Sequence, residues 1–301
     1  GNTGAMGGAG GGGGVGGKPN TQDQAPASMV PGGWDLVGTS MEQLPVMIYD
    51  GPFSDHLADR APAMQAAPVD RTEAERQMRR QVPGADTARV VGVEEVSGNL
   101  PTYSFRLAPA ATNGGAYTAV ADVARNGGFL VQWLNSREIG EATLDLERAR
   151  TLGIQYLASI GLADMTPTYG QIQDGIATIA FAYKQNNVVV YPDQVKLKVA
   201  LDNGEVLGVD ARQYLMAHHP RDLRPATITP EQAQKVVRPD LRVERTQLAL
   251  IPNQAGSGEI LTYEFLARMG EEVFLIYVNA NTGQEEQILQ QIQNDGGTFA
   301  L

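Results

Sequence analysis

Alternating large apolar and polar positions predict short strands in three parts of the chain. The segment Tyr103–Leu107 alternates strictly, and similar segments return at 176–183 and 261–266. Because alternation with a period of two places every second side chain on one face, each segment is expected to contribute one apolar face to a small antiparallel sheet. Two further strand-like segments follow each of them, at 117–123 and 129–134, 195–201 and 205–209, and 273–278 and 284–288.

A capped helix start precedes each group of strands. Asp70, Asp145 and Thr229 can each accept a hydrogen bond from a free amide of a first helical turn. Glu73 and Gln232, three positions after Asp70 and Thr229, are expected to complete capping boxes. The sequence therefore predicts one helix at the start of each group.

The spacing between helix start and hairpin turn is nearly constant, which predicts a repeated unit. An alanine in the first turn of each predicted helix precedes a turn glycine by 53, 55 and 50 residues. Glycine allows the positive backbone angles that tight hairpins need. We expect an α+β fold of three tandem repeats, each a helix packed on a small antiparallel sheet, with neighbouring units in contact. The alanines and glycines are Ala74 and Gly127, Ala149 and Gly204, and Ala233 and Gly283.

The first part of the chain has a different character. Residues 1–31 are rich in Gly, Gln, Ser and Pro, and are expected to form a disordered tether. An extended arm follows, in which Val46–Tyr49 can be a short strand before a turn at Gly51 and Pro52. The predicted boundaries are 1–31 for the tether, 32–66 for the arm, and 67–140, 141–222 and 223–301 for the three repeats.

Composition and charge narrow the function classes. The 301 residues carry 23 Lys and Arg against 34 Asp and Glu, a net charge of −11, which disfavours nucleic acid and anionic lipid as partners. The chain has no cysteine, so disulfides, thiolate metal sites and cysteine nucleophiles are excluded. No apolar run is long enough to span a membrane, and we expect any membrane anchor to lie upstream of this segment.

Candidate groups for nucleophilic catalysis are few. Histidine occurs only at positions 56, 218 and 219, and a Ser-His-Asp arrangement would need one of them. Ser54, Asp55 and His56 are adjacent in the sequence, but neighbouring side chains of an extended segment point in opposite directions and cannot form a relay. No catalytic residue is predicted.

A metal site and a glycosidase site are the two other kinds of site considered, and for each a simpler explanation of the residues is favoured. His218 and His219 could bind a metal with Asp222, but adjacent histidines rarely point the same way, and a polar linker between repeats is favoured. A pair of carboxylates could hydrolyse glycosides, but solvated loop charge explains the acidic residues more simply. We expect no metal and no cofactor. The carboxylates considered are Glu94, Glu95, Glu141, Glu271 and Glu272.

The pattern of helix start, Tyr-x-Phe strand and Asn-Gly hairpin resembles the PepSY domain family. A more specific resemblance lies in the arm, where residues 44–56 read Leu-Pro-Val-Met-Ile-Tyr-Asp-Gly-Pro-Phe-Ser-Asp-His. This run is similar to the segment that precedes the PepSY repeats in the YpeB family of spore germination proteins. Arm and repeats together extend the resemblance from about residue 34 to about residue 291.

The resemblance implies a protein held at the spore inner membrane by an upstream anchor, with this region facing the cortex. It implies as partner a cortex-lytic, SleB-like hydrolase that the protein stabilises or regulates without being an enzyme. A cell-wall hydrolase and an inhibitor of a secreted protease stay open as alternatives. Exchange of elements between chains would also permit a homo-oligomer.

Aromatic and charged residues of the arm and sheet are the candidate contacts for a partner, since aromatic side chains supply much of the binding energy of interfaces. For Trp133 and Phe53 the alternative is ordinary packing inside the protein, and it is favoured. The partner-binding candidates are Tyr49, Asp50, Phe53, Asp55, His56, Trp133 and Tyr191.

Overall fold

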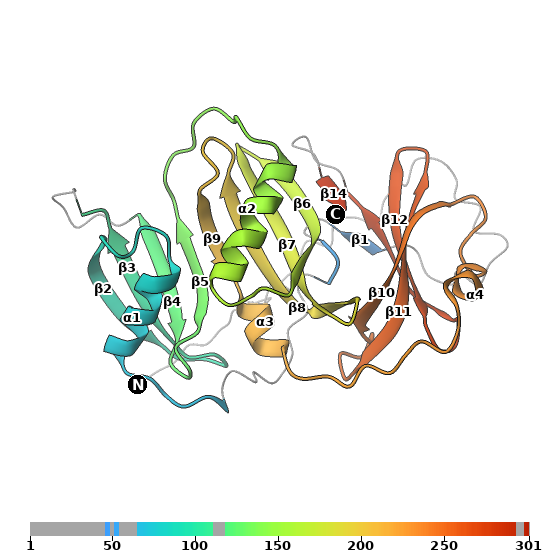
Figure 1. Cartoon of the computed structure of the whole chain (residues 1–301), viewed down its shortest axis with the longest axis horizontal. Coiled ribbons are helices and arrows are strands. Elements are labelled where there is room, and N and C mark those ends of the chain that lie inside the picture. The colour runs from blue at the N-terminus through green and yellow to red at the C-terminus, as the bar shows by residue number, and fades with distance from the viewer. Residues whose placement is uncertain (1–45, 49–50, 54–64, 111–117, 293–297, 301) are drawn as a thin grey trace, which may run out of the picture. The chain divides into compact units, whose positions relative to one another are not determined.

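The computed structural model describes residues 46–48, 51–53, 65–110, 118–292 and 298–300, all within one compact unit that comprises residues 42–301. The predicted tether, residues 1–31, lies outside the described residues. The described chain is a mixed α+β fold with few helices and one large, mostly antiparallel sheet (Figure 1).

Three groups of four strands follow one another along the chain, each after a helix. Within each group the strands pair antiparallel in chain order. Group 1 comprises α1 (Arg71–Gln81), β2 (Arg89–Val96), β3 (Thr102–Ala108), β4 (Ala119–Ala124) and β5 (Leu130–Asn135). Group 2 comprises α2 (Leu146–Ser159), β6 (Met165–Gln173), β7 (Ile176–Gln185), β8 (Val188–Ala200) and β9 (Val206–Asp210). Group 3 comprises α4 (Pro230–Gln234), β10 (Arg242–Pro252), β11 (Glu259–Met269), β12 (Glu272–Asn279) and β13 (Glu285–Gln291).

The groups are joined edge to edge, which corrects the expectation that each forms a small sheet of its own. β5 pairs antiparallel with β9, with Trp133 opposite Val209. The first residues of β8 pair parallel with β10, with Val189 opposite Ala249. Strand edges expose unpaired amides and carbonyls, so pairing satisfies groups that separate sheets would leave open. In the described part of the chain, the twelve strands of the three groups and two further short strands form one 14-stranded sheet.

Three short elements complete the fold. β1 (Val46–Ile48) is the predicted arm strand, and it pairs parallel with β13, Val46 lying opposite Leu289. β14 (Thr298–Ala300) pairs antiparallel with β6. The helix α3 (Arg212–Ala217) connects β9 to the linker that precedes group 3, and no sequence pattern had predicted it.

Helices α1 and α2 pack against one continuous apolar core. Ala74 and Met78 of α1, and Ala149 and Leu157 of α2, are buried in the same cluster of side chains. Both helices lie on the same side of the strands in Figure 1. Their shared core makes groups 1 and 2 one packed body. The strands contribute Phe105, Val123, Trp133, Ile179, Phe181, Leu197 and Val209, among others.

All three predicted N-caps are present, but only one of the two capping boxes is. Asp70, Asp145 and Thr229 each accept a hydrogen bond from the amide three residues on. The Thr229 amide in turn donates to Gln232 Oε1 at 2.8 Å, which completes the capping box. The box at Glu73 was predicted wrongly, because its carboxylate instead accepts hydrogen bonds from other α1 side chains, those of Arg76 and Gln77.

The hairpin turns of the three groups share one hydrogen-bond pattern. The residue at the end of the second-last strand donates to the carbonyl five positions on, and accepts from a glycine amide four positions on. Those glycines are Gly128, Gly204 and Gly283, with φ of 69°, 80° and 75°. Gly127, from which the spacing had been counted, is the neighbour of the equivalent residue and has φ of 81°.

The first strand of every group escaped prediction, and all three contain a bulge. Each of β2, β6 and β10 has a shift of register against its partner strand: between Val90 and Gly92, between Pro167 and Tyr169, and between Val243 and Arg245. A bulge adds one residue to a strand and so breaks the two-residue alternation on which the prediction relied. The broken alternation makes a strand harder to recognise, but it is not sufficient to hide one, because β13 also contains a shift of register and was predicted.

Candidate functional site

A bulge in the middle of β8 gives the most distinctive polar arrangement in the molecule. Ala182 of β7 lies opposite Gln194, but the next residue, Tyr183, lies opposite Val190. The three residues skipped are Tyr191, Pro192 and Asp193. Proline cannot donate to a strand ladder, so a bulge is one of the few places in a sheet where it is accepted. The bulge directs Tyr191 and Asp193 into two separate buried clusters.

The first cluster surrounds the buried carboxylate of Glu264. It accepts hydrogen bonds from the hydroxyl of Tyr191, from that of Tyr277 at 2.7 Å, and from Gln247 Nε2 at 2.7 Å. Arg245 contacts the same carboxylate at 3.3 Å. Burial, and then the charge of Glu264, raise the pKa of both tyrosines well above the usual 10. Both phenols therefore remain protonated donors, and the carboxylate is fully engaged.

The arm turn Gly51–Phe53 packs on this cluster. The ring of Phe53 lies 5.3 Å from that of Tyr191 and 5.2 Å from that of Tyr277, centroid to centroid. Gln194 Nε2 donates to the Pro52 carbonyl at 2.7 Å, and Gln213 Nε2 donates to the Phe53 carbonyl at 3.1 Å. We call these four contact residues, Tyr191, Gln194, Gln213 and Tyr277, the arm seat.

Backbone geometry makes the arm turn specific. Gly51 has φ of 95°, and a Cβ there would lie 3.0 Å from the side chain of Tyr169. Phe53 also has a positive φ, 57°, which is unfavourable for a bulky residue. The contacts with the arm seat offset this strain, so the turn depends both on Gly51 and on the arm seat.

The second cluster surrounds the buried carboxylate of Asp193. Arg221 binds it through two nitrogens, at 2.8 and 2.9 Å, and binds Glu259 of β11 as well. His218 Nδ1 lies 2.7 Å from the same Asp193 carboxylate, and its ring stacks on Tyr214. Burial opposes the charge of Arg221, but its hydrogen bonds to Glu259 and Asp193 outweigh that and raise its pKa.

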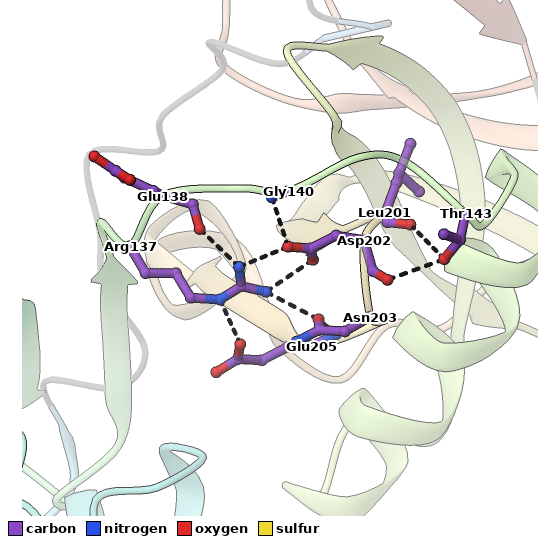
Figure 2. A network of polar contacts seen from close by, with 8 residues as sticks. All are labelled: Arg137, Glu138, Gly140, Thr143, Leu201, Asp202, Asn203 and Glu205. Atoms are coloured by element: carbon purple, nitrogen blue, oxygen red, sulfur yellow. Dashed lines mark hydrogen bonds and ion pairs between the residues drawn. The ribbon is translucent and has the colours of Figure 1, made fainter.

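A related network holds the linker between groups 1 and 2 (Figure 2). Arg137 forms two hydrogen bonds to Asp202 in the β8–β9 turn, both of 2.9 Å, and one to Glu205 at 2.7 Å. The Gly140 amide also donates to Asp202, at 2.8 Å. Hydrogen bonds from Arg137 and then from Gly140 lower the pKa of Asp202. Each linker thus carries an arginine that binds an aspartate and a glutamate: Arg137 binds two residues of the β8–β9 turn in group 2, and Arg221 binds Asp193 of group 2 and Glu259 of group 3.

These clusters join parts of the chain, and their polar groups are occupied by one another. In the described ranges no three or more His, Asp or Glu side chains are grouped as metal ligands would be. His218 and His219 point to different partners, His219 Nδ1 lying 2.8 Å from the Ala217 carbonyl oxygen. Of the carboxylates considered for glycoside hydrolysis, Glu94 of β2 pairs with Arg106 of the neighbouring strand β3, and Glu95 pairs with Arg125, which follows β4.

The predicted partner-binding residues lie in different surroundings. Trp133 is buried, and its indole nitrogen donates to the Tyr156 hydroxyl at 3.0 Å. Tyr191 is buried in the Glu264 cluster, and Phe53 is half-buried on the arm seat. The structure shows contacts of these three residues with other parts of the same chain. That they also bind a partner stays a prediction. Tyr49, Asp50, Asp55 and His56 lie outside the described residues.

Sequence reasoning missed the residues that organise both clusters. Glu264 was considered only as part of an alternating strand, and Arg221 and Glu259 not at all. Arg221 and Glu259 lie 38 residues apart in the chain, so no local spacing connects them. One signal was available in principle, because a Pro-Asp pair inside an apolar strand indicates a bulge.

No helix in the described part of the chain combines the length and apolar character needed to cross a membrane.

Comparison with known proteins identifies relatives of the chain. Residues 30–224 match the family model described as YpeB sporulation, PepSY1 and PepSY2 domains. Proteins named sporulation protein YpeB are 39% identical in Oceanobacillus iheyensis and 31% identical in Bacillus subtilis, over 56% of this chain in both cases. The matched region covers 37% of the length of each relative.

One solved structure has a similar fold. The Bacillus megaterium YpeB C-terminal domain aligns over 76% of this chain and all of its own length, with a TM-score of 0.67. Its sequence identity to this chain is 24%, so the likeness concerns the fold.

Proposed function

Because this chain belongs to the YpeB sporulation family, we propose that it acts in spore germination as a non-enzymatic regulator of a cortex-lytic, SleB-like hydrolase. In this proposal it binds the hydrolase and stabilises it. The relatives bear the name of a sporulation protein, and this chain spans about 37% of their length. The hydrolase enters the proposal through the resemblance of the arm and strands to the family.

The observation that best supports a binding role is the arm seat. Two glutamine side chains, Gln194 and Gln213, hold the carbonyls of a peptide turn, and two tyrosine rings hold its phenylalanine. Backbone recognition combined with an aromatic anchor is the chemistry by which small domains bind peptide segments. The buried carboxylates beside the arm seat are already paired, which suits a framework better than a catalytic centre.

Co-purification with the hydrolase tests the proposal. Wild-type chain and Phe53→Ala are each mixed with the purified hydrolase, with Val96→Ala as a control that shortens an exposed apolar residue elsewhere. We expect Phe53→Ala to bind less hydrolase than wild type, and Val96→Ala to bind as wild type does. Thermal unfolding of each variant alone shows whether a loss of binding follows from a loss of folding.

Enzyme assays separate this proposal from its two alternatives. The hydrolase should retain activity longer at elevated temperature when the chain is present, because binding stabilises the folded form. A lower initial rate would identify an inhibitor instead. Sustained peptidoglycan release by the chain alone, lost when a carboxylate is replaced, would contradict a non-enzymatic role and support the cell-wall hydrolase.

We also propose that the three groups are tandem PepSY-type repeats and that the protein lies at the spore inner membrane facing the cortex. The shared turn pattern of the three groups supports the repeats. The family model ends at residue 224, before α4, so the third repeat rests on that pattern alone. Fractionation of spores, with detection of the protein in inner-membrane and integument fractions, tests the location.

A further inference from the structure

A cavity of about 540 Å³ lies between the C-terminal ends of α1 and α2. Gln77 and Gln81, from the last turns of α1, line one side of it, and residues 160–162, just after α2, line another. Phe129, Tyr214 and His218 complete its polar and aromatic lining. Cavities of this size are typical of small-ligand sites. This one shares no residue with the arm seat, and it shares Tyr214 and His218 with the Asp193 cluster.

The glutamine and histidine side chains at the cavity offer three acceptors. Gln77 Nε2 donates to Glu73 and Gln81 Nε2 to the Gln77 carbonyl, so in the described part of the chain both Oε1 atoms are open to accept, while each amide also keeps one N–H. His218 Nδ1 is directed at Asp193, and in the neutral imidazole this leaves Nε2 as a further acceptor. A ligand that supplies N–H or O–H donors can bind these three acceptors.

The electrostatic setting favours a cation among such ligands. Two helices of 11 and 14 residues end at the cavity, and each C-terminus carries partial negative charge. Burial, and then the negative charges of Asp193 and Asp164, raise the pKa of Tyr214 in its wall to about 12, although Arg221 pairs with Asp193. Of the two arginines in the last turn of α1, Arg79 is bound to Glu75 and to the carbonyls of Ala85 and Ala88, and neither lines the cavity.

The aromatic lining favours a flat cation. Phe129 keeps 42% of its surface exposed, which is unusual for a phenylalanine next to a core. Its ring lies over Gly127, where a Cβ would approach a ring carbon to 2.2 Å, so only glycine leaves room for this ring position. Guanidinium groups stack on aromatic faces and present five donors, whereas an ammonium group presents three.

We infer that this cavity binds the guanidinium group of an arginine in an exposed segment of a partner protein. The net charge of −11 makes a basic segment the complementary partner. This inference does not depend on the proposed regulation of a hydrolase, because it concerns a different surface.

Binding of a short peptide to the full chain tests the inference. The probe is acetyl-Gly-Arg-Gly-amide, and its control is the same peptide with citrulline, which has the shape of arginine without the charge. The expected result is a chemical-shift change at the amides of Gly127, Gly128 and Gly161, which are part of the lining. The arginine peptide should bind at least about fivefold tighter than the citrulline peptide.

Charge variants sharpen the test. Gln81→Glu adds an anion to the cavity and should tighten binding of the arginine peptide by about two- to fivefold, and Gln81→Lys should weaken it by a similar factor. Gln155→Glu and Gln155→Lys make the same charge changes at an exposed site of α2 outside the lining, and should have little effect. Thermal unfolding of each variant shows that it is folded.

Three results would overturn the inference. They are equal affinity for the arginine and citrulline peptides, shift changes that avoid the three glycines, and Gln81 variants that behave like the Gln155 variants. A lysine peptide that binds as tightly as the arginine peptide would replace guanidinium recognition with recognition of positive charge alone.

Discussion

Each linker between groups carries an arginine that pairs with an aspartate of group 2 and with a glutamate, but the two arginines differ in burial. Arg137 pairs with Asp202 and Glu205 where both side chains of the Arg137–Asp202 pair retain solvent, 26% and 16% exposed. Arg221 pairs with Asp193 and Glu259, and there the exposed fractions of Arg221 and Asp193 are 4% and 0%. Solvent screens the Arg137–Asp202 pair more than the Arg221–Asp193 pair. The two hydrogen bonds within each pair are therefore expected to contribute unequally to the free energy of unfolding.

The largest effect is expected for Arg221→Ala. Among the described residues it leaves the buried carboxylate of Asp193 with His218 as its one side-chain partner, and removal of one member of a buried ion pair typically costs about 3–5 kcal/mol. Urea denaturation measures the loss in the free energy of unfolding. The matched control is Arg242→Ala at the start of β10. Arg242 also pairs with a carboxylate, that of Glu244, but its side chain is 76% exposed. Similar losses in both variants would break the comparison.

Tyr277→Phe extends the comparison to a buried carboxylate that is held mainly by neutral donors. The variant removes one of the hydrogen bonds to Glu264, and a hydrogen bond to a buried charge contributes about 2 kcal/mol. Tyr263→Phe is the control, because the Tyr263 hydroxyl donates to a neutral carbonyl, that of Ile228, at 2.8 Å. Its loss in the same urea experiment should be about 1 kcal/mol. A larger loss for Tyr263→Phe would contradict the role of the buried charge.

Glu285 provides the case of a partly buried carboxyl group to which no arginine is paired in the described residues. Burial raises its pKa from the usual 4.5 to about 7. The folded state therefore holds the proton more tightly than the unfolded state does, and stability falls as the pH rises from about 4.5 to about 7.

Glu285→Gln removes this dependence, because glutamine stays neutral. The full difference in pKa would correspond to about 3 kcal/mol, and partial exposure reduces our expectation to about 1–2 kcal/mol. Thermal unfolding should show Glu285→Gln to be more stable than wild type at pH 8 and equal to it at pH 4. A constant difference at both pH values would show that the effect is not due to the proton.

The smallest effect is expected for Arg137→Ala. Ion pairs that solvent screens contribute little to stability, and the Arg137–Asp202 pair is partly exposed. The midpoint of thermal unfolding should therefore fall by at most about 3 °C, and by less in 1 M salt. Because the pKa of Asp202 is lowered in the folded state, its contribution is present at neutral pH and is lost as the pH falls below the usual range of aspartate. The gap between variant and wild type should therefore close in acid. A gap that is independent of salt and pH would mean that Arg137 acts by packing.

The parts of the fold that could be predicted are those encoded within a few residues. The caps at Asp70, Asp145 and Thr229, and the turn glycines Gly204 and Gly283, depend on neighbours close in the chain, and all five have the predicted geometry. The joining of the groups into one sheet could not be predicted. The sequences of β5, β8, β9 and β10 contain no pattern that indicates which strand pairs with which across groups.

The candidate site shows the same limit. Tyr191 was selected as an aromatic residue for binding a partner, and it is buried against Glu264, which lies 73 residues further along the chain. The residue type was informative, since buried tyrosines need a hydrogen-bond partner. The identity of that partner depends on the packing of group 3 against group 2, which the local sequence does not determine, even where the Pro192-Asp193 pair indicates the bulge in β8.

The parallel pairing of β1 with β13 has a consequence for biosynthesis. Val46 emerges from the ribosome early, but the strand opposite it begins at Glu285 and is translated near the end of this region. A strand with no partner is open to misassembly and to proteases until its partner appears. The strand β1 can therefore pair only after β13 has been translated, and protection of β1 reports that β13 is in place.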